Sequence, residues 1–281
     1  MTSEPPSGQD PLALTDTWPV PQVATAVLGA DGSLVATRGP AQEPFRLASV
    51  AKLITAYAVM IGVQEGAVSL EDEVGPASST LRHLLAHTSG LGFDSGDPTL
   101  AKPGERRIYS NAGIELAAQH LADSAAIEFG AYLSEAVLEP LGMRSTSLEG
   151  SPAHGIFSTL DDVVAFVREI RAPRLLEPVT LAEMVTVQFP GLSGVIPGVG
   201  RFDPCDWGLG FERNFGRPRH WAGQSPSSQS FGHFGGAGTF VWVDPVAALA
   251  CVCLTDRPFD AWALKVWPPL VDAVIANFGA T

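Results

Sequence analysis

The sequence predicts an α+β fold in which strands from both ends of the chain form one antiparallel sheet flanked by helices. Runs rich in β-branched residues occur near both termini, whereas the long segment between them has helical character interrupted by Gly and Pro. We therefore expect an all-helical insertion between the two parts of the sheet. The cleft between two such lobes is a natural position for a ligand site.

The terminal segments contain two predicted hairpins. In the first, over 22–39, two β-branched runs surround the turn sequence Ala-Asp-Gly-Ser; the second covers 239–257, with Asp244-Pro245 at its turn. A helix over roughly 260–277 closes the chain. The first 20 residues are rich in Pro, Asp and Ser and predict an irregular lead-in.

The middle of the chain is predicted to be mainly helical. The apolar run over 47–64 has the length and composition of a helix, and 70–150 has the pattern of several short helices. Two more helices are expected within 158–187, the first opened by a variant capping box at Ser158-Thr-Leu-Asp161. The Gly- and Pro-rich segment 188–232 predicts loops. No internal repeat is evident.

Composition limits the class of protein. A chain of 281 residues with 46% hydrophobic residues can bury a sizeable core. Its 17 basic and 30 acidic residues give a net charge of −13, which argues against a nucleic-acid or anionic-membrane surface. We also expect no membrane span, since no apolar run reaches about 18 residues, and no signal peptide, since a basic start followed by an apolar core is missing.

The three cysteines point to a reducing compartment. Cys251 and Cys253 stand at i and i+2 in a strand-like run, where two small side chains are expected to pack on one face rather than form a disulfide. Cys205 is left without an obvious partner. Together with the N-terminus, this pattern predicts a cytoplasmic protein.

One lysine stands in an unexpected place. The apolar run RLASVAKLITAYAV, 46–59, contains Lys52, one of only three lysines in the chain, three residues after Ser49. Residues i and i+3 share a helix face, so the two side chains would meet. A desolvated lysine with a pKa near ~7–8 can act as the base that a serine nucleophile needs. Chance alone gives this spacing with a frequency of ~0.2 in a chain of this composition, so it is weak by itself.

Two further motifs follow in order. Tyr109-Ser110-Asn111 has a chance expectation of ~0.03, and a tyrosine and an amide near a lysine could assist proton transfer and hold a carbonyl. The alternative is a helix N-cap made by Ser110 or Asn111. His233-Phe234-Gly235, before a predicted strand, is expected by chance ~0.6 times and matters only through its order and context.

Together the motifs resemble serine hydrolases of the penicillin-binding and β-lactamase superfamily. The resemblance is to the branch of class C β-lactamases, D-alanyl-D-alanine carboxypeptidases, D-aminopeptidases and related esterases. It extends over nearly the whole chain through the additional segments LRHLLAHTSGL (81–91), KPGERRIYSNAG (102–113), EPLGM (139–143), GIFSTLDDVVAF (155–166), WGLGFE (207–212) and LTDR (254–257).

The resemblance implies a single β-lactamase/transpeptidase-like catalytic domain over 1–281. Its α/β lobe would comprise about 1–48 and 225–281, and its helical lobe about 49–224. No cofactor and no metal are implied. The substrate would be a small molecule or short peptide, and we expect a monomer.

The resemblance also implies roles for individual residues. Ser49 would be the nucleophile, Lys52 its proton acceptor or relay, and Tyr109 the partner base and the acid for the leaving group. Substrate would be bound by Asn111, His233, Gly235 and Gly236. Two fixed backbone N–H groups, those of Ser49 and Gly236, would form the oxyanion hole.

His233 and Phe234 depart from the family pattern. Class C β-lactamases have a lysine and a hydroxyl residue at these positions. A neutral imidazole binds a β-lactam carboxylate less firmly than an ammonium does, and Phe234 cannot donate a hydrogen bond. The departure weakens the prediction of efficient β-lactam hydrolysis and leaves acyl transfer intact.

A metal site is a poorer interpretation of the histidines. His83 and His87 have the i, i+4 spacing of zinc ligands on a predicted helix end, but HLLAH contains no glutamate and no third ligand is evident. We therefore expect structural roles for both. The predicted function is a serine acyl hydrolase that cleaves a β-lactam, a D-amino-acid peptide or a carboxylic ester; the alternative is a non-catalytic, penicillin-binding-like ligand-binding module.

Overall fold

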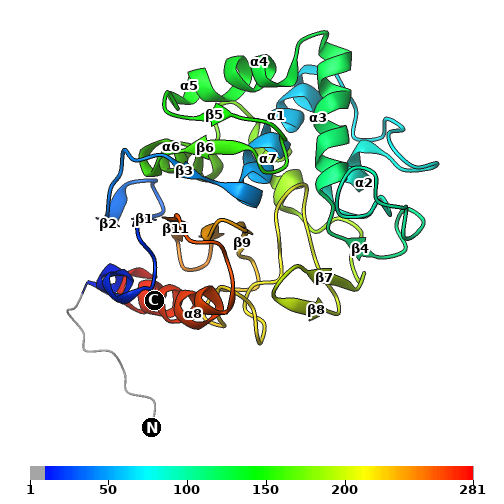
Figure 1. The fold of residues 1–281 in the computed structure, drawn as a ribbon. Helices are drawn as coiled ribbons and strands as arrows, with labels where there is room; N and C mark the ends of the chain where they lie inside the picture. The colour runs from blue at the N-terminus through cyan, green and yellow to red at the C-terminus, as the bar shows by residue number, and fades with distance from the viewer. Residues whose placement is uncertain (1–9, 281) are drawn as a thin grey trace.

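A computed structural model of the protein describes residues 10–280. Its central sheet has five antiparallel strands in the order β2-β1-β11-β10-β9 (Figure 1). β1 pairs directly with β11, Val23 opposite Thr255, so strands from the two ends of the chain are neighbours as the sequence predicts. The strands are β1 (Val23–Leu28), β2 (Leu34–Arg38), β9 (Phe231–Gly235), β10 (Thr239–Asp244) and β11 (Leu249–Thr255).

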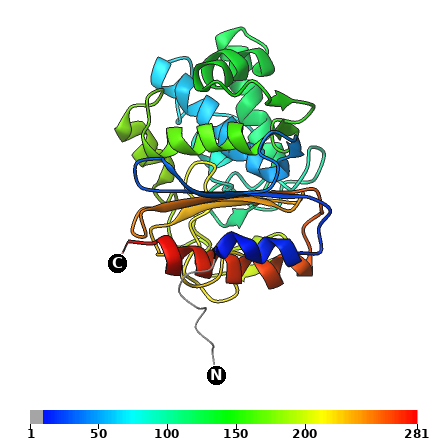
Figure 2. The ribbon, with the colours of Figure 1, turned by 90° about the vertical axis from the view of Figure 1, so that its left-hand side faces the viewer.

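Helices cover both faces of this sheet (Figure 2). One face carries α8 (Ala261–Phe278) together with the 3-10 helix η1 (Pro11–Thr17), and the other carries α6 (Leu160–Arg171). The prediction of an irregular lead-in is wrong for η1, and residues 1–9 lie outside the described part. The helix forms because Asp10 accepts a hydrogen bond from Leu12 N and because Leu12 is buried.

The segment between the sheet's two parts is mainly helical. The first helix of 158–187 begins one residue later than predicted, because Thr159 and not Ser158 is the N-cap and accepts from Asp162 N at 3.3 Å. The other helical elements of this segment are the 3-10 turn η2 (Ala48–Val50), α1 (Ala51–Glu65), α2 (Leu81–Leu85), α3 (Asn111–Ala125), α4 (Phe129–Leu133), the π-helical turn η3 (Ser134–Leu138), α5 (Glu139–Leu141) and α7 (Pro178–Val185).

Two small sheets show that the insertion is not all helical. One contains β3 (Phe45–Arg46), β6 (Ile156–Ser158) and β5 (Ser147–Leu148); the other contains β4 (Arg107–Ile108), β7 (Gly194–Ile196) and β8 (Gly200–Phe202). The second sheet lies partly in the segment 188–232, where only loops were predicted. Strands this short pair through distant segments, with Arg107 N donating to Ser193 O, and have no local pattern that would reveal them.

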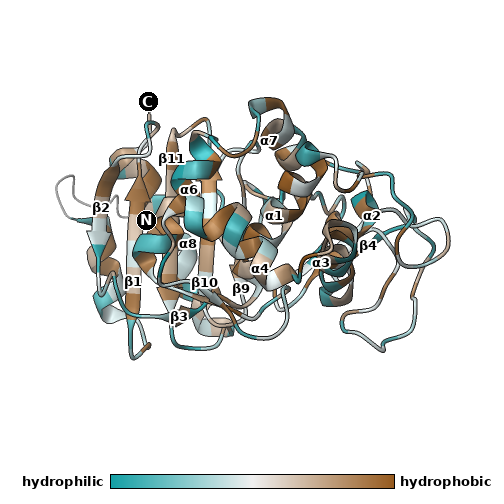
Figure 3. Cartoon of the chain, turned by 90° about the horizontal axis from the view of Figure 1, so that it is seen from above, coloured by the Kyte–Doolittle hydropathy of each residue, from teal (hydrophilic) through white to brown (hydrophobic). Residues whose placement is uncertain are grey.

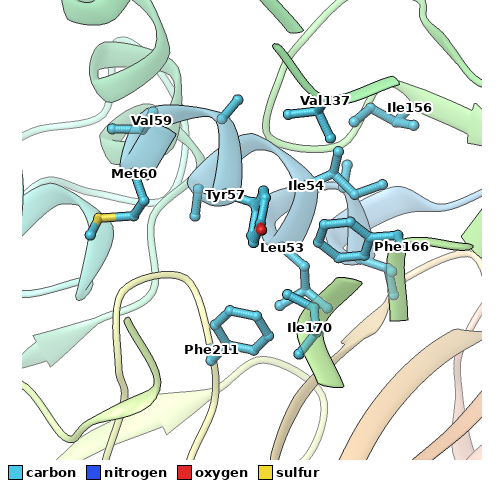
Figure 4. Packing of buried hydrophobic residues seen from close by; sticks show 14 of the residues in the cluster. Leu53, Ile54, Tyr57, Val59, Met60, Val137, Ile156, Phe166, Ile170 and Phe211 are labelled. Atoms are coloured by element: carbon cyan, nitrogen blue, oxygen red, sulfur yellow. The ribbon is translucent and has the colours of Figure 1, made fainter. Parts of the chain in front are cut away.

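Helix α1 lies in the middle of the hydrophobic core. Its side chains are apolar almost all round, and Leu53, Ile54 and Tyr57 contact side chains of α6 such as Phe166 and Ile170 (Figure 4). Viewed from above and coloured by hydropathy, the central strands are largely hydrophobic, whereas α6 shows both kinds of residue (Figure 3). Burial on every side fixes the N-terminal end of α1 firmly between the sheet and the helices.

The cysteines pack as predicted. Cys251 and Cys253 are free, fully buried and on one side of β11, in a cluster that includes Trp242 and Trp267. Cys205 is also free and buried.

Candidate active site

Ser49 lies in η2, where the chain turns from the sheet into α1. The preceding Ala48 has a φ of 46°, in the left-handed region that costs a non-glycine residue free energy. Thr239 Oγ1 donates to Leu47 O at 2.8 Å and holds this turn against the sheet. A Cβ on Gly235 would lie only 2.3 Å from Leu47 O and 3.2 Å from Ser49 N, so this close approach requires glycine.

Lys52 is fully buried and contacts three oxygen atoms. Its Nζ lies 3.1 Å from Ser49 Oγ, 2.7 Å from Asn111 Oδ1 and 2.9 Å from Ala153 O. The amide and carbonyl oxygens can only accept, whereas the serine hydroxyl can also donate. A neutral lysine would therefore direct two N–H groups to Asn111 and Ala153 and its lone pair to the Ser49 hydroxyl.

Electrostatics favour this neutral form. Burial lowers the pKa of Lys52 from 10.5 to about 7, and the negative charges of Glu115 and Asp94 oppose part of that decrease. At neutral pH a large fraction of Lys52 is consequently unprotonated. The placement of Ser49 and Lys52 on one helical turn gives them the contact that their spacing predicts.

Asn111 connects Lys52 to a carboxyl group that the sequence analysis missed. Its Nδ2 donates to Asp94 Oδ1 at 2.8 Å while its Oδ1 accepts from Lys52. Asn111 is the first residue of α3, and Ser110 is the N-cap, with Oγ accepting from Gly113 N at 3.0 Å. The capping alternative is thus confirmed and coexists with the contact to Lys52. Asp94 stands in a loop with no pattern that would have identified it.

Tyr109 lies between Lys52 and His233. Its ring centroid is 4.9 Å from Lys52 Nζ, and its hydroxyl is 3.3 Å from His233 Nε2. His233 Nδ1 donates to Phe234 O at 2.6 Å, which leaves Nε2 as the acceptor for the tyrosine proton. Burial lowers the pKa of His233 to about 3 and raises the pKa of Tyr109, so the imidazole is neutral and the phenol protonated at neutral pH.

A cavity of about 250 Å³ opens in front of these groups. Of the predicted site residues, Ser49, Tyr109, His233 and Gly236 line it, whereas Lys52, Asn111 and Gly235 do not. Apart from the predicted site residues, the lining is mainly hydrophobic, and of its members the sequence analysis had singled out Phe234. It consists of Phe93, Ile196, Pro197, Gly198, Trp207, Phe234 and Phe259.

Of the two histidines of HLLAH, His83 lies within α2 and His87 lies beyond its end. α2 ends at Leu85, and His87 stands beyond it with a φ of 56°, so the expected i, i+4 arrangement on one helix end is wrong. His83 Nδ1 accepts from Thr80 N at 3.2 Å at the start of α2. The buried His87 ring lies 4.6 Å from the Tyr109 ring and accepts from Ser110 N at 3.2 Å. Residues 10–280 contain no group of His, Cys, Asp and Glu side chains arranged to hold a metal ion.

Several solved structures have the same fold. A β-lactamase from Mycobacterium bovis is 47% identical, with a TM-score of 0.93 over 96% of this chain and 100% of that one. Simvastatin synthase from Aspergillus terreus, in a mutant form, is 18% identical, with a TM-score of 0.80 over 95% and 93% of the two chains. EstCE1, a hydrolase with promiscuous acyltransferase activity, is 17% identical, with a TM-score of 0.72 over 94% and 96%. The last two likenesses concern the fold alone.

A curated relative gives a shorter match. An uncharacterized protein from Alkalihalophilus pseudofirmus is 38% identical over 85 residues, which is 27% of this chain and 25% of that protein. This alignment covers about a quarter of each protein and therefore carries no conclusion about activity.

The fold and the site define a serine hydrolase of the penicillin-binding and β-lactamase superfamily. The Beta-lactamase family model matches residues 19–274, and the chain belongs to that family. Within residues 10–280, no helix combines the length and the apolarity needed to cross a bilayer.

Proposed function

We propose that the protein is a serine acyl hydrolase that cleaves small carboxylic esters through a covalent acyl-enzyme, with the whole chain acting as one catalytic domain. The observation that carries this proposal is the environment of Lys52. It is a fully buried amine with a pKa near 7, and its one partner able to donate a proton is the Ser49 hydroxyl, 3.1 Å away. A buried base beside a hydroxyl that faces a cavity is what nucleophilic catalysis requires.

The proposed reaction begins with neutral Lys52. It accepts the proton of Ser49 as Oγ bonds to the substrate carbonyl carbon, and the N–H groups of Ser49 and Gly236 stabilise the oxyanion. When the carbonyl re-forms, the bond to the leaving oxygen breaks and Tyr109 donates its proton to that oxygen. The Lys52 ammonium then returns a proton to Tyr109. Water repeats the sequence on the acyl-enzyme, releasing the acid and restoring Ser49.

The lining of the cavity favours an ester with an uncharged acyl group. Both ring nitrogens of His233 are engaged, and the low pKa of this ring keeps it neutral, so it offers no charge to a substrate carboxylate. Lys52 is fully buried, does not line the cavity and donates to Asn111, so it offers no charge there either. The cavity lining includes the aromatic side chains of Phe93, Trp207 and Phe259, which suit an apolar group.

Hydrolysis of β-lactams is the second candidate. It is supported by the 47% identity to the β-lactamase of Mycobacterium bovis and by the family assignment. The absence of an available cation at the position of His233 argues that a β-lactam would be turned over more slowly than an ester. D-Amino-acid peptides carry a similar carboxylate and are expected to be poor substrates for the same reason.

The test compares labelling and turnover in wild-type protein and Ser49→Ala. We expect a fluorophosphonate probe to label the wild type, and p-nitrophenyl butyrate to be hydrolysed faster than nitrocefin or D-alanyl peptides. Both labelling and turnover should disappear in Ser49→Ala. Ser89→Ala, at a buried serine outside the cavity, is the matched control. A wild type that no acylating probe labels and that cleaves no ester or amide would instead support the non-catalytic ligand-binding alternative.

A further inference from the structure

A second cavity adjoins the first. It has a volume of about 280 Å³ and shares Tyr109 and Pro197 with the catalytic cavity. Its floor is the small sheet of β4, β7 and β8, at the end of the molecule away from β2 (Figure 1). The other residues along this second cavity, which we call the arginine groove, are Leu100, Arg106, Arg107, Ile108, Ser193, Gly194, Val195 and Arg201.

The arginine groove is positive in a strongly negative protein. Three arginines line it and none of its lining residues is Asp or Glu, although the chain has a net charge of −13. Arg106 and Arg201 are exposed, and within residues 10–280 neither forms an ion pair with a carboxylate. Elsewhere arginines such as Arg82 are paired with two carboxylates.

The two exposed guanidinium groups keep donors available. Arg106 Nη2 donates to Leu100 O at 2.8 Å, and Arg201 Nη2 makes a long contact of 3.4 Å with Ser193 Oγ. The neighbouring Glu105 carboxylate accepts from Lys102 N at 3.0 Å and forms no ion pair with Arg106. A guanidinium has five N–H donors, so most of those on Arg106 and Arg201 remain free to bind an anion.

Arg107 supplies charge rather than donors. It is buried, and its Nε and Nη2 donate to the backbone oxygens of Cys205 and Gln188, each at 2.8 Å. Burial lowers its pKa only to about 10, so it stays protonated at neutral pH. Arg107 is among the residues that line the groove, and its charge strengthens the attraction for an anion bound there.

The position of Tyr109 decides which part of a substrate would enter. Tyr109 is among the residues that line both cavities, and in the proposed reaction its hydroxyl, 3.3 Å from His233 Nε2, protonates the leaving oxygen. Because the two cavities meet at Tyr109 and Pro197, a leaving group protonated by Tyr109 can extend from the catalytic cavity into the arginine groove while the acyl group occupies the aromatic cavity. His233, at the position expected to hold a substrate carboxylate, lines only the catalytic cavity.

We propose that the arginine groove is an oxyanion subsite for the leaving group, so that the preferred substrate is an ester of an uncharged apolar acid with an alcohol that carries a carboxylate or phosphate. This inference rests on the proposed ester hydrolysis. It differs from β-lactam recognition because the anion is held by Arg106 and Arg201, one cavity away from His233.

The test uses two esters with matched leaving groups. Butyrate esters of 4-hydroxyphenylacetate and 4-hydroxyphenylacetamide differ in one charge that a methylene insulates from the reacting oxygen. We expect kcat/KM at low ionic strength to be about tenfold higher for the carboxylate ester, from two exposed charge contacts. This preference should shrink in ~0.5 M salt because exposed charges are screened. The butyrate ester of 4-hydroxybenzylphosphonate is compared with the same uncharged ester. A kcat/KM ratio larger than that of the carboxylate ester indicates a site for phosphate-type anions, and a smaller ratio indicates a site for carboxylates.

Variants of the two exposed arginines test whether the groove causes the preference for the carboxylate ester. The double variant Arg106→Gln/Arg201→Gln should remove the preference, and Arg201→Glu should invert it. The control Arg144→Gln alters an exposed arginine outside both cavities and should retain the preference. Equal kcat/KM for the two esters in the wild type, while p-nitrophenyl butyrate is hydrolysed, would overturn the subsite and leave the proposed function intact.

A binding measurement separates the two proposals. If no ester is hydrolysed, titration calorimetry with the products 4-hydroxyphenylacetate and 4-hydroxyphenylacetamide still tests the groove. We expect the carboxylate to bind more tightly to wild-type protein, and the difference to vanish in the double variant. Equal affinity of the two products, or a difference that the double variant keeps, would overturn the subsite.

Discussion

Lys52 and Glu212 are both fully buried, and each is held by polar groups, but their surroundings differ. Glu212 accepts from His220 Nε2 at 2.8 Å and from Trp221 Nε1 at 2.9 Å, and both of these partners are buried. Lys52 also has two fixed partners, but its third, the Ser49 hydroxyl, lines a cavity and can either donate or accept.

The difference teaches that burial of a charged group does not by itself mark an active site. In the Glu212 cluster, His220 and Trp221 both donate to the carboxylate, His220 Nδ1 accepts from Ala222 N, and neither side chain lines the catalytic cavity. Such a cluster stabilises the loop that carries it and costs free energy when it is broken. At Lys52, the partner Ser49 can exchange a proton and lines the cavity that would receive a substrate. Burial here lowers the pKa of Lys52, which prepares the amine to accept the Ser49 proton.

The largest effect expected from this comparison is on turnover. Lys52→Met should lower kcat for p-nitrophenyl butyrate by about 1000-fold or more, because the general base is removed while the buried volume is kept. Steady-state kinetics and circular dichroism would establish that activity and not folding is lost. Lys265→Met, at an exposed position on α8, is the matched control. A Lys52→Met enzyme with near wild-type kcat would refute the role of the lysine.

For the Glu212 cluster we expect the reverse, a loss of stability with little loss of turnover. Glu212→Gln replaces one accepting oxygen by an amide that faces a buried donor, and should lower the free energy of unfolding by about 3 kcal/mol. Urea unfolding measures this loss. Turnover per folded molecule, counted by active-site titration, should change by less than about fivefold. A large fall in kcat with unchanged stability would show that Glu212 belongs to the catalytic machinery.

A third expectation concerns the pH dependence of stability. The pKa of Lys52 is about 7 in the folded protein and near 10.5 when unfolded, so between these values the unfolded chain binds one proton more. Stability therefore rises with pH in this range. Relative to Lys52→Met, the wild type should gain about 1.4 kcal/mol per unit from pH 7.5 to 9. Urea unfolding at several pH values tests the slope, and a flat difference would mean that Lys52 is not desolvated.

The smallest effect should follow from Asp94. Since Lys52 must be neutral to act, kcat/KM should rise with pH through a midpoint near 7. The negative charge of Asp94 raises the pKa of Lys52, so Asp94→Asn should move this midpoint to lower pH by less than about one unit. Asp123→Asn, exposed on α3, should leave it unchanged. A midpoint shifted to higher pH in Asp94→Asn would contradict the assignment.

Local patterns predicted much of this molecule. The two hairpins, the central helix and the C-terminal helix each have a periodicity or turn signal within one segment, and the structure confirms them. The candidates Ser49, Lys52, Tyr109, Asn111 and His233 were found because their motifs occur in a particular order. Asp94 and the aromatic residues Phe93 and Phe259 had no such signal, because they come from separate loops that meet only in the folded chain.

The sequence by itself determined the reactive groups and the class of fold, since residue types and their periodicity set what each segment can form. Tertiary structure decided how those groups behave. Packing of α1 on every side removed water from Lys52 and lowered its pKa, and the pairing of β7 with both β4 and β8 brought Arg107 and Arg201 to one groove. Desolvation and the meeting of distant segments depend on the whole fold, so no local pattern could have predicted them.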